Sequence, residues 1–225
     1  MKPYILNIHT ATESAIVNLS HGKETLYSSF NNITKEHAAF LHPAIEEVLQ
    51  KGGIEVKHLH SVAVSAGPGS YTGIRVGLAA AKGLCYALKI PAITYNTLEL
   101  MALSAMDTIK EKNILYCPMI DARRMEVYTA VYDSNMKIIE APIAMILDES
   151  SFAMRLSSGK ILFFGSGSKK FHGVVTSSSA RFTDINIDSK ILTHLAAEKY
   201  ERSDFQNILS MEPLYMKEFY TTSKK

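Results

Sequence analysis

A glycine-rich segment between a β-rich run and a helical pattern constrains this chain more than any other part of its sequence. Its glycines are Gly67, Gly69, Gly73 and Gly77. A strand that ends in a glycine loop and feeds a helix places unpaired helix N–H groups at that loop. Glycine also permits φ > 0 and lacks the side chain that would block a close approach. The segment predicts a strand–loop–helix unit that holds a phosphate, a partner's backbone or no ligand at all.

The spacing of these glycines excludes the two commonest phosphate loops. A Walker A loop needs Gly-x-x-x-x-Gly-Lys-Ser/Thr, whereas five residues separate Gly67 from Gly73, and Ile74 and Arg75 follow. A dinucleotide fingerprint needs Gly-x-Gly-x-x-Gly, and the spacing from Gly69 to Gly73 is one residue too long for it. Any phosphate held here would therefore be held by a different loop.

The full string is more specific than its glycines. Residues 67–73 are Gly-Pro-Gly-Ser-Tyr-Thr-Gly, with Arg75 two residues further on. This string resembles the signature of the bacterial TsaB (YeaZ) family, relatives of TsaD, the threonylcarbamoyl transferase that modifies adenosine 37 of tRNAs reading codons that begin with A. Four further segments match that family in order: 5–13, 36–43, 121–128 and 212–217. The resemblance thus extends over nearly the full chain.

Composition indicates a globular protein with an ordinary charge balance. The 225 residues are 47% hydrophobic and 20% charged, and the net charge is +2. Scattered basic residues argue against a stand-alone RNA-binding module. Cys85 and Cys117 lie in apolar runs and are predicted to be buried free thiols rather than a disulfide or metal pair. Asn7 and His9 interrupt the first apolar run, which excludes a signal peptide there. No membrane span is predicted, and we expect a cytoplasmic protein.

Hydrophobic periodicity predicts an α/β chain in two similar halves. Strands are expected at 4–9, 15–20, 24–30, 61–65, 93–94, 114–120, 126–132, 138–139 and 160–164. Helices are expected at 38–49, from the glycine loop to about residue 88, and at 98–109, 150–156, 191–199 and 204–209. The order in the first half is that of the actin/sugar-kinase/Hsp70 fold, which the family resemblance also implies, with mixed sheets flanked by helices. We expect an N-terminal lobe over 1–104 and a C-terminal lobe over 105–225, with the last helix returning to the first lobe.

The helix after the glycine loop is the leading candidate for a binding surface. Its small residues allow a close helix approach, but each internal glycine costs roughly 1 kcal/mol, which tight packing must recover. That packing could be internal, against the sheet. The family resemblance implies a second use, in contact with TsaD or with another copy of the chain. The predicted partner-binding residues are Tyr71, Thr72, Gly73, Arg75, Gly77 and His37.

The residues at the end of the first strand and in the glycine loop argue against nucleotide binding by this chain alone. The weak candidates for phosphate contacts are Thr10, Thr12, Gly67, Gly69 and Ser70. Actin-like phosphotransferases usually carry an acidic residue at the end of the first strand, where this chain has His9. Histidine cannot supply an anionic group for magnesium. Whether His9 reflects a lost function or a harmless replacement is open at this point.

A metal site is not expected. The TsaD relatives bind metal through a His-x-x-x-His helix, whereas His37 and His42 are five residues apart. That separation places them about 140° apart around a helix, so chelation would need help from a kink at Pro43. The alternative to metal binding is that one histidine makes a polar contact and the other lies on the surface.

A charged segment forms the turn of the predicted central hairpin: Asp121, Arg123, Arg124 and Glu126. It is interpreted either as a turn with local salt bridges or as a polar contact across the inter-lobe cleft or with a partner. A second glycine turn, 165–167, lies where actin-like folds meet adenosine, although a plain strand-end turn also explains it.

The leading functional hypothesis is a non-catalytic partner of TsaD, with no catalytic residues of its own. The resemblance implies that it acts with TsaD and the ATPase TsaE in threonylcarbamoyl transfer to tRNA, that it forms a homodimer when TsaD is absent, and that tRNA is contacted only through the complex. We expect that this chain requires no cofactor and that ATP or ADP could occupy the interface of the complex. The alternatives are an ATP-dependent phosphotransferase and a zinc-dependent peptidase.

Overall fold

Two five-stranded mixed sheets form the framework of the computed structural model, which describes residues 2–33 and 36–216. The first sheet contains β1 (Tyr4–His9), β2 (Ala15–His21), β3 (Glu24–Asn31), β4 (Ser61–Gly67) and β5 (Ala92–Asn96), in the order β3-β2-β1-β4-β5. The three N-terminal strands are antiparallel, and β4 and β5 run parallel to β1. The central strands β1 and β4 are buried along almost their whole length, which explains their nearly continuous apolar sequence.

The second sheet repeats this connectivity. It contains β6 (Leu115–Asp121), β7 (Glu126–Tyr132), β8 (Ile138–Ile146), β9 (Ile161–Phe164) and β10 (Ala180–Thr183), in the order β10-β9-β6-β7-β8. Again the hairpin strands are antiparallel and the last two are parallel to the first. The predicted fold class is confirmed: the chain has the actin-like α/β architecture of two similar lobes. The repeat exists in the topology although the sequence shows no obvious duplication.

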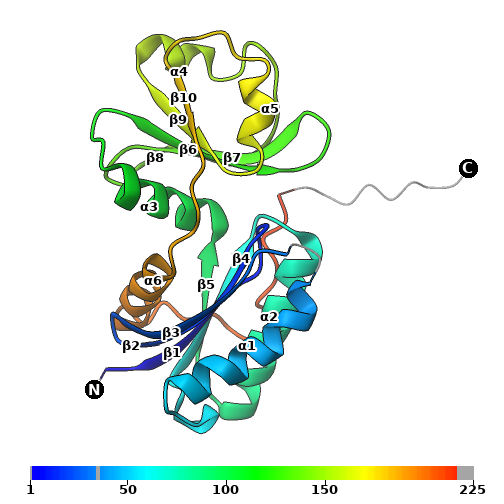
Figure 1. Cartoon of the computed structure of the whole chain (residues 1–225), viewed down its shortest axis with the longest axis vertical. Helices are drawn as coiled ribbons and strands as arrows, with labels where there is room; N and C mark the ends of the chain where they lie inside the picture. The colour runs from blue at the N-terminus through cyan, green and yellow to red at the C-terminus, as the bar shows by residue number, and fades with distance from the viewer. Residues whose placement is uncertain (1, 34–35, 217–225) are drawn as a thin grey trace, which may run out of the picture.

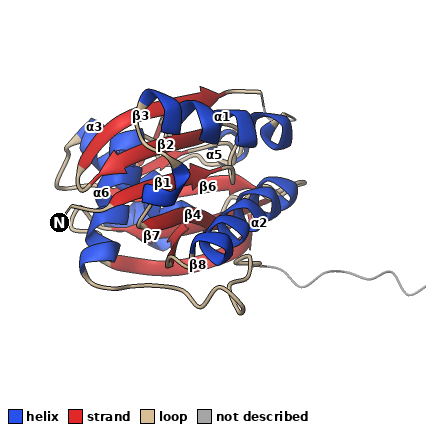
Figure 2. Ribbon diagram, turned by 90° about the horizontal axis from the view of Figure 1, so that it is seen from below, coloured by secondary structure: helices blue, strands red, loops and turns tan. Residues whose placement is uncertain are grey.

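Helices complete the layers around the two sheets (Figure 1). They are α1 (His37–Lys51), α2 (Tyr71–Leu88), α3 (Thr97–Ile109), α4 (Ala153–Ser158), α5 (Ser168–His172) and α6 (Ser189–Glu201), with a short 3-10 turn at Val56–His58. Figure 2 shows α1 and α2 lying along the same side of the first sheet. The helix α1 continues through Pro43 without interruption. None of the helices among the described residues is long and apolar enough to cross a membrane.

The layer between the two sheets consists of α3 and α6. The largest core cluster joins Tyr95 of β5, Met101 of α3, Tyr116 of β6 and Leu192 of α6. Although α3 follows the first sheet in the chain, it packs mainly on β6, whereas α6 follows the second sheet and packs on β1, β2 and β3. Polar groups fix α6 there, because Asn18 Nδ2 donates to the Ser189 carbonyl oxygen at 2.8 Å.

Some predicted elements are wrong in the second half. The helix predicted at 204–209 is absent: this segment is a turn whose Gln206 N–H donates to the Ala92 carbonyl oxygen of edge strand β5 at 2.8 Å. Strand β8 is nine residues long rather than a short strand at 138–139. The predictions omitted α5 and β10, and α4 begins three residues later than expected, at Ala153 instead of 150. The closing segment 212–217 is described only as far as Met216.

Candidate functional site

The glycine loop packs against the turn between β1 and β2. The Ser70 N–H donates to the Ala11 carbonyl oxygen at 2.8 Å. A Cβ atom added at Gly69 would lie 2.0 Å from that same Ala11 oxygen, and one at Gly73 would lie 2.0 Å from the Thr10 carbonyl oxygen. Real Cβ atoms do not approach backbone that closely, so these glycines are needed by the chain's own packing. The inner side of the loop is therefore filled by the β1–β2 turn.

The predicted phosphate contacts are mostly used inside the fold. Thr10 is buried, and its hydroxyl donates to the Gly73 carbonyl oxygen at 2.7 Å. The Ser70 hydroxyl caps α2 by accepting from the Gly73 N–H at 3.3 Å. A Cβ at Gly67 would lie 3.0 Å from both the Ile74 side chain and the Leu214 carbonyl oxygen. Thr12, Gly69 and Ser70 retain partial exposure.

Three of the predicted partner-binding residues are buried: His37 in α1, and two glycines in α2. Gly73 and Gly77 are buried, and a Cβ at Gly77 would lie 2.5 Å from the Thr10 hydroxyl oxygen. Their small size brings α2 close to β1 and β4. The expectation that these two glycines offer a surface to another protein is therefore corrected. Any direct contact of α2 with a partner would involve the exposed residues of the helix.

A buried polar cluster lies below the β1–β2 turn. His9 is fully buried, with Nδ1 at 2.6 Å from the Ser65 hydroxyl and Nε2 at 2.8 Å from the Thr12 hydroxyl. Burial, together with the nearby His37, lowers the pKa of His9 to about 3. The imidazole is therefore neutral at physiological pH. At the end of β1 this chain therefore has an uncharged hydrogen-bonding side chain.

The two histidines of α1 do not converge. His37 is buried and its Nε2 lies 2.9 Å from the Thr12 carbonyl oxygen, whereas His42 is exposed. His37 Nδ1 is buried without a hydrogen-bond partner. Within 2–33 and 36–216 there is no group of three or more His, Cys, Asp or Glu side chains that could hold a metal ion. Cys85 and Cys117 are buried free thiols, as predicted.

The outer side of the loop carries an exposed aromatic–arginine stack. The Tyr71 and Tyr215 rings stack with centroids 5.7 Å apart, and the Arg75 guanidinium lies 4.0 Å from the centre of the Tyr71 ring. Arg75 Nε also donates to the Tyr215 hydroxyl at 2.7 Å. Tyr71 is 44% exposed. Tyr215 belongs to the closing segment that supported the family resemblance, but it was not predicted as a site residue.

The exposed side of α2 continues from this stack along the helix. Thr72, Ala79, Gly83 and Tyr86 are exposed, and the exposed fraction of Tyr86 is 75%. A Cβ at Gly83 would meet nothing within 4 Å, in contrast to Gly73 and Gly77. The helix therefore has a closely packed inner side and an open outer side with small residues.

The charged turn of the second lobe forms local contacts. Asp121 accepts from Lys170 Nζ at 2.8 Å and from the Arg123 N–H at 2.6 Å. Partial burial acts to raise the pKa of Asp121, but these hydrogen bonds outweigh it and the pKa is lowered. The Ser166 hydroxyl accepts from the Asp121 N–H at 3.1 Å. Asp121 is therefore held by one backbone contact inside the turn and by an ion pair with Lys170 of α5, and both interpretations of the turn stay predictions.

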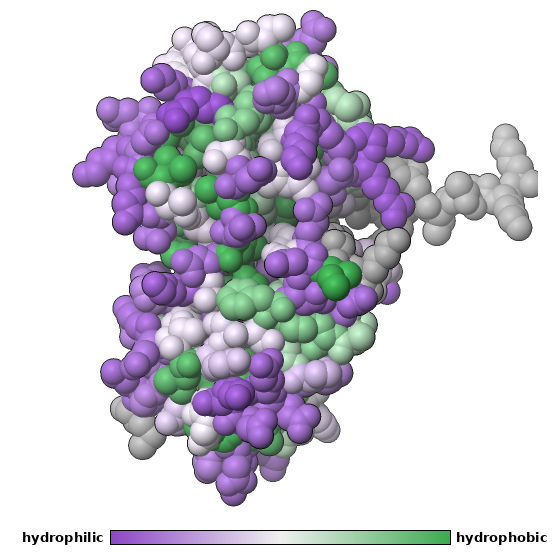
Figure 3. All heavy atoms as spheres, viewed as in Figure 1, coloured by the Kyte–Doolittle hydropathy of each residue, from purple (hydrophilic) through white to green (hydrophobic). Residues whose placement is uncertain are grey.

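Two cavities lie between the lobes. One, of about 530 Å³, separates the glycine loop from Asp121, Arg123 and Tyr128, and Tyr215 borders it. The other, of about 360 Å³, lies between the β1–β2 turn and the second glycine turn at 165–166. Figure 3 shows hydrophilic side chains over most of both lobes on this face, with apolar patches near their junction. Sequence patterns did not reveal either cavity, since each is lined by segments far apart in the chain.

A protein-family model matches residues 28–188, and its description is "TsaD: tRNA N6-adenosine threonylcarbamoyltransferase". Curated relatives named tRNA threonylcarbamoyladenosine biosynthesis protein TsaB match over part of their length. The relative from Buchnera aphidicola of Schizaphis graminum is 35% identical over 62% of this chain and 65% of its own length. The relative from Escherichia coli K12 is 35% identical over 58% of this chain and 55% of its own length. The match thus spans less than two thirds of these relatives.

Two solved structures share the fold over nearly the full chain. YeaZ from Pseudomonas aeruginosa superposes with a TM-score of 0.81 at 22% identity, covering 95% of this chain and 99% of that one. A second structure, an uncharacterized protein from Pseudomonas aeruginosa with similarity to peptidase YeaZ, has a TM-score of 0.83 at 22% identity, covering 96% of this chain and 100% of that one. At this identity the likeness concerns the fold.

Proposed function

The chain belongs to the TsaD family and within it resembles TsaB and YeaZ proteins, and from that premise we propose that it is a non-catalytic partner of a TsaD protein in tRNA threonylcarbamoylation. The reaction would be formation of threonylcarbamoyladenosine at adenosine 37 of tRNAs that read codons beginning with A. TsaE would act in the same assembly in the cytoplasm. The tRNA would be contacted through the complex, and two copies of this chain would pair when TsaD is absent.

The observation that carries this proposal is the difference between the two sides of the glycine loop and α2. The inner side is closed, because Gly69 and Gly73 lie against the carbonyl oxygens of Ala11 and Thr10. The outer side is open, with Tyr71 and Arg75 at one end and Gly83 further along. A loop already filled by its own turn is poorly suited to cradle a phosphate. An open helix face with small residues and an aromatic–arginine end is suited to a protein partner.

The strand end at His9 supports the same assignment. A neutral, fully hydrogen-bonded imidazole at this position cannot act as an anionic group toward magnesium. Together with the closed loop, this weighs against the phosphotransferase alternative. Any ATP or ADP in the assembly would then sit at the interface with another subunit rather than on this chain alone.

The deciding experiment is a tRNA threonylcarbamoylation assay with TsaD and TsaE from the same organism, with and without this chain. We expect product only when the chain is present. Tyr71→Ala and Arg75→Ala should lower both the yield and the affinity for TsaD, measured by calorimetry. Full-rate modification without the chain, or modification by the chain alone, would refute the proposal.

Two variants that each introduce an arginine separate partner contact from folding. Gly83→Arg places a large side chain on the open side of α2, where there is room for it in the isolated chain. We expect it to fold normally and to lose TsaD binding. Met154→Arg, at a residue 81% exposed in the second lobe, is the control and should leave binding unchanged. Normal TsaD binding by Gly83→Arg would move the interface away from α2.

A further inference from the structure

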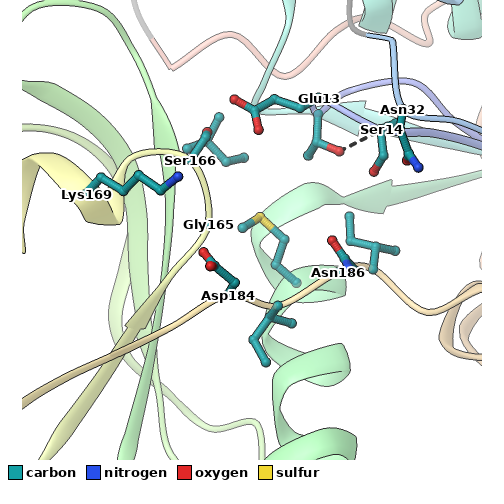
Figure 4. A pocket seen from close by; sticks show the side chains of 13 residues that line it. Glu13, Ser14, Asn32, Gly165, Ser166, Lys169, Asp184 and Asn186 are labelled. Atoms are coloured by element: carbon teal, nitrogen blue, oxygen red, sulfur yellow. Dashed lines mark hydrogen bonds between the residues drawn. The ribbon is translucent and has the colours of Figure 1, made fainter.

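The smaller inter-lobe cavity has a lining that the proposed partner role does not use. It lies between the β1–β2 turn, the start of α3, the glycine turn after β9 and the connector between β10 and α6 (Figure 4). Its volume is about 360 Å³, near the lower end of the range for small-molecule pockets. None of its residues belongs to α2.

Three exposed charged side chains line this cavity, and no ion pair joins them. Figure 4 shows Glu13, Lys169 and Asp184 arranged around the same space. Within the described part of the chain, none of the three takes part in a side-chain hydrogen bond or an ion pair. The neighbouring Lys170 differs, because it is paired with Asp121 at 2.8 Å. Lys169 is therefore the cation that the cavity itself offers, and the two carboxylates come from different lobes.

Neutral polar and apolar groups complete the lining. The exposed amides of Asn32 and Asn186 border the cavity (Figure 4), and neither side chain has a hydrogen-bond partner among the residues described. Met101 and Ile187 supply apolar surface. The methyl end of Met101 reaches this position because residue 165 is glycine: a Cβ there would lie 2.4 Å from Met101 Cε.

We propose that this cavity binds a small α-amino acid in its zwitterionic form. Lys169 would pair with the ligand carboxylate, and Asp184 and Glu13 would receive the ammonium group, since charge-assisted hydrogen bonds of this kind are the strong ones. Asn32 and Asn186 would bind a polar side chain, and Met101 would contact its carbon atoms. The three lining charges sum to −1, because two carboxylates face one ammonium group. That balance repels a nucleoside polyphosphate and is matched by a ligand carrying its own cation.

The inference is independent of the proposed role with TsaD. Loss of TsaD binding in α2 variants would leave this cavity intact, and an empty cavity would leave the threonylcarbamoylation result unchanged. The partner role and the amino-acid site can therefore be refuted independently of each other.

Calorimetry and ligand-observed NMR on the full chain test the proposal directly. The probes are glycine, L-serine, L-threonine and L-leucine, with glycine methyl ester and N-acetylglycine as forms that lack one of the two charges. We expect one or more amino acids to bind in the millimolar range or tighter, and both blocked forms to bind at least about tenfold more weakly. Magnesium–ADP and putrescine are included as competing ligand classes.

Variants locate the binding on the molecule. Lys169→Ala and the isosteric Asp184→Asn should each weaken amino-acid binding by about tenfold or more. Lys112→Ala, at an exposed lysine outside the cavity, should bind like the unaltered chain. Circular dichroism confirms that each variant is folded. No binding by any amino acid, stronger binding of magnesium–ADP or putrescine, or binding that survives both cavity variants would overturn the proposal.

Discussion

The two lobes share one strand order but differ in what covers their sheets. The first sheet carries helices α1 and α2 of 15 and 18 residues, whereas the corresponding helices of the second lobe, α4 and α5, have six and five. The second lobe compensates with aromatic side chains: Phe152, Phe163 and Phe171 pack edge to face, with ring centroids 4.8–5.4 Å apart.

The strand-end loops of the two lobes use the same device. In the first lobe, Ser70 N–H donates to the Ala11 carbonyl oxygen, and in the second, Gly167 N–H donates to the Met119 carbonyl oxygen. Each loop thus joins the hairpin of its own sheet. The loop geometry therefore belongs to the architecture that both lobes share, whereas the long exposed helix after the loop is particular to the first lobe. That helix, rather than the loop, is the feature of the first lobe that is suited to a binding surface.

The largest expected effect tests the aromatic core of the second lobe. Phe171→Ala removes a fully buried ring that contacts three other phenylalanines. We expect the free energy of unfolding to fall by about 3–5 kcal/mol, because the cavity cannot collapse completely. Denaturant titration measures this, with Tyr86→Ala on the open face of α2 as the control. A loss below that of the control would mean that the short helices, not the rings, hold this lobe.

The shared loop device predicts similar losses in both lobes. Gly69→Ala brings Cβ to 2.0 Å from the Ala11 oxygen, and Gly165→Ala brings it to 2.5 Å from the Met119 oxygen, both at positive φ. Each should destabilise the chain by about 2–4 kcal/mol through steric overlap and backbone strain. Thermal and denaturant unfolding compare the pair. A large loss in only one lobe would end the equivalence of the two loops.

His9 and Asp121 occupy equivalent strand ends in the two lobes but differ in charge and burial. The pH dependence of the free energy of unfolding should reveal this difference. The folded-state pKa of His9 is about 3, below the value of 6.5 expected when unfolded, so the unfolded chain binds an extra proton between these pH values. Stability from His9 is fully present above pH 6.5 and falls as the pH drops, by about 2 kcal/mol at pH 5.

Unfolding measured from pH 7 to 5 should show this slope in the unaltered chain and lose most of it in His9→Asn. The exposed His42→Asn serves as the control and should retain the slope. An unchanged slope in His9→Asn would assign the acid sensitivity to other groups.

The smallest effect separates the two sides of α2. Gly83→Ala adds a methyl group where no atom lies within 4 Å. It should stabilise the chain by about 0.5–1 kcal/mol, because alanine favours the helix more than glycine does. Gly73→Ala is the matched inner-side change and should destabilise. Changes in the free energy of unfolding with the same sign in both variants would contradict the assignment of an open and a packed side of α2.

Sequence patterns predicted the first lobe better than the second for physical reasons. The strands of the first sheet are long and bounded by turns, and Ser70 and Gly73 mark the start of α2 through a cap. In the second lobe, α5 is too short to show helical periodicity, and β10 is a four-residue edge strand with no fully buried residue. Phe205 and Leu209 suggest an amphipathic helix, but both are exposed and the segment follows the edge of β5 instead.

The candidate site divides in the same way. The contiguous string 67–75 predicted the loop, the exposed Tyr71 and Arg75. It could not predict that Gly73 and Gly77 face inward, because that depends on how closely α2 approaches Thr10, the residue after β1. Nor could it assemble the smaller cavity, since Glu13 and Asp184 are brought together only by the packing of the two lobes.

The exchange of α3 and α6 between the sheets has a consequence for synthesis of the chain. The first sheet is complete at Asn96, yet the helix that covers one of its faces is Ser189–Glu201. During translation that face of the sheet stays uncovered until nearly the whole polypeptide has been synthesised. A protease cut in the exposed linker at residues 110–113 would give fragments that each hold the covering helix of the other. Such fragments should remain associated and reassemble as a complementing pair.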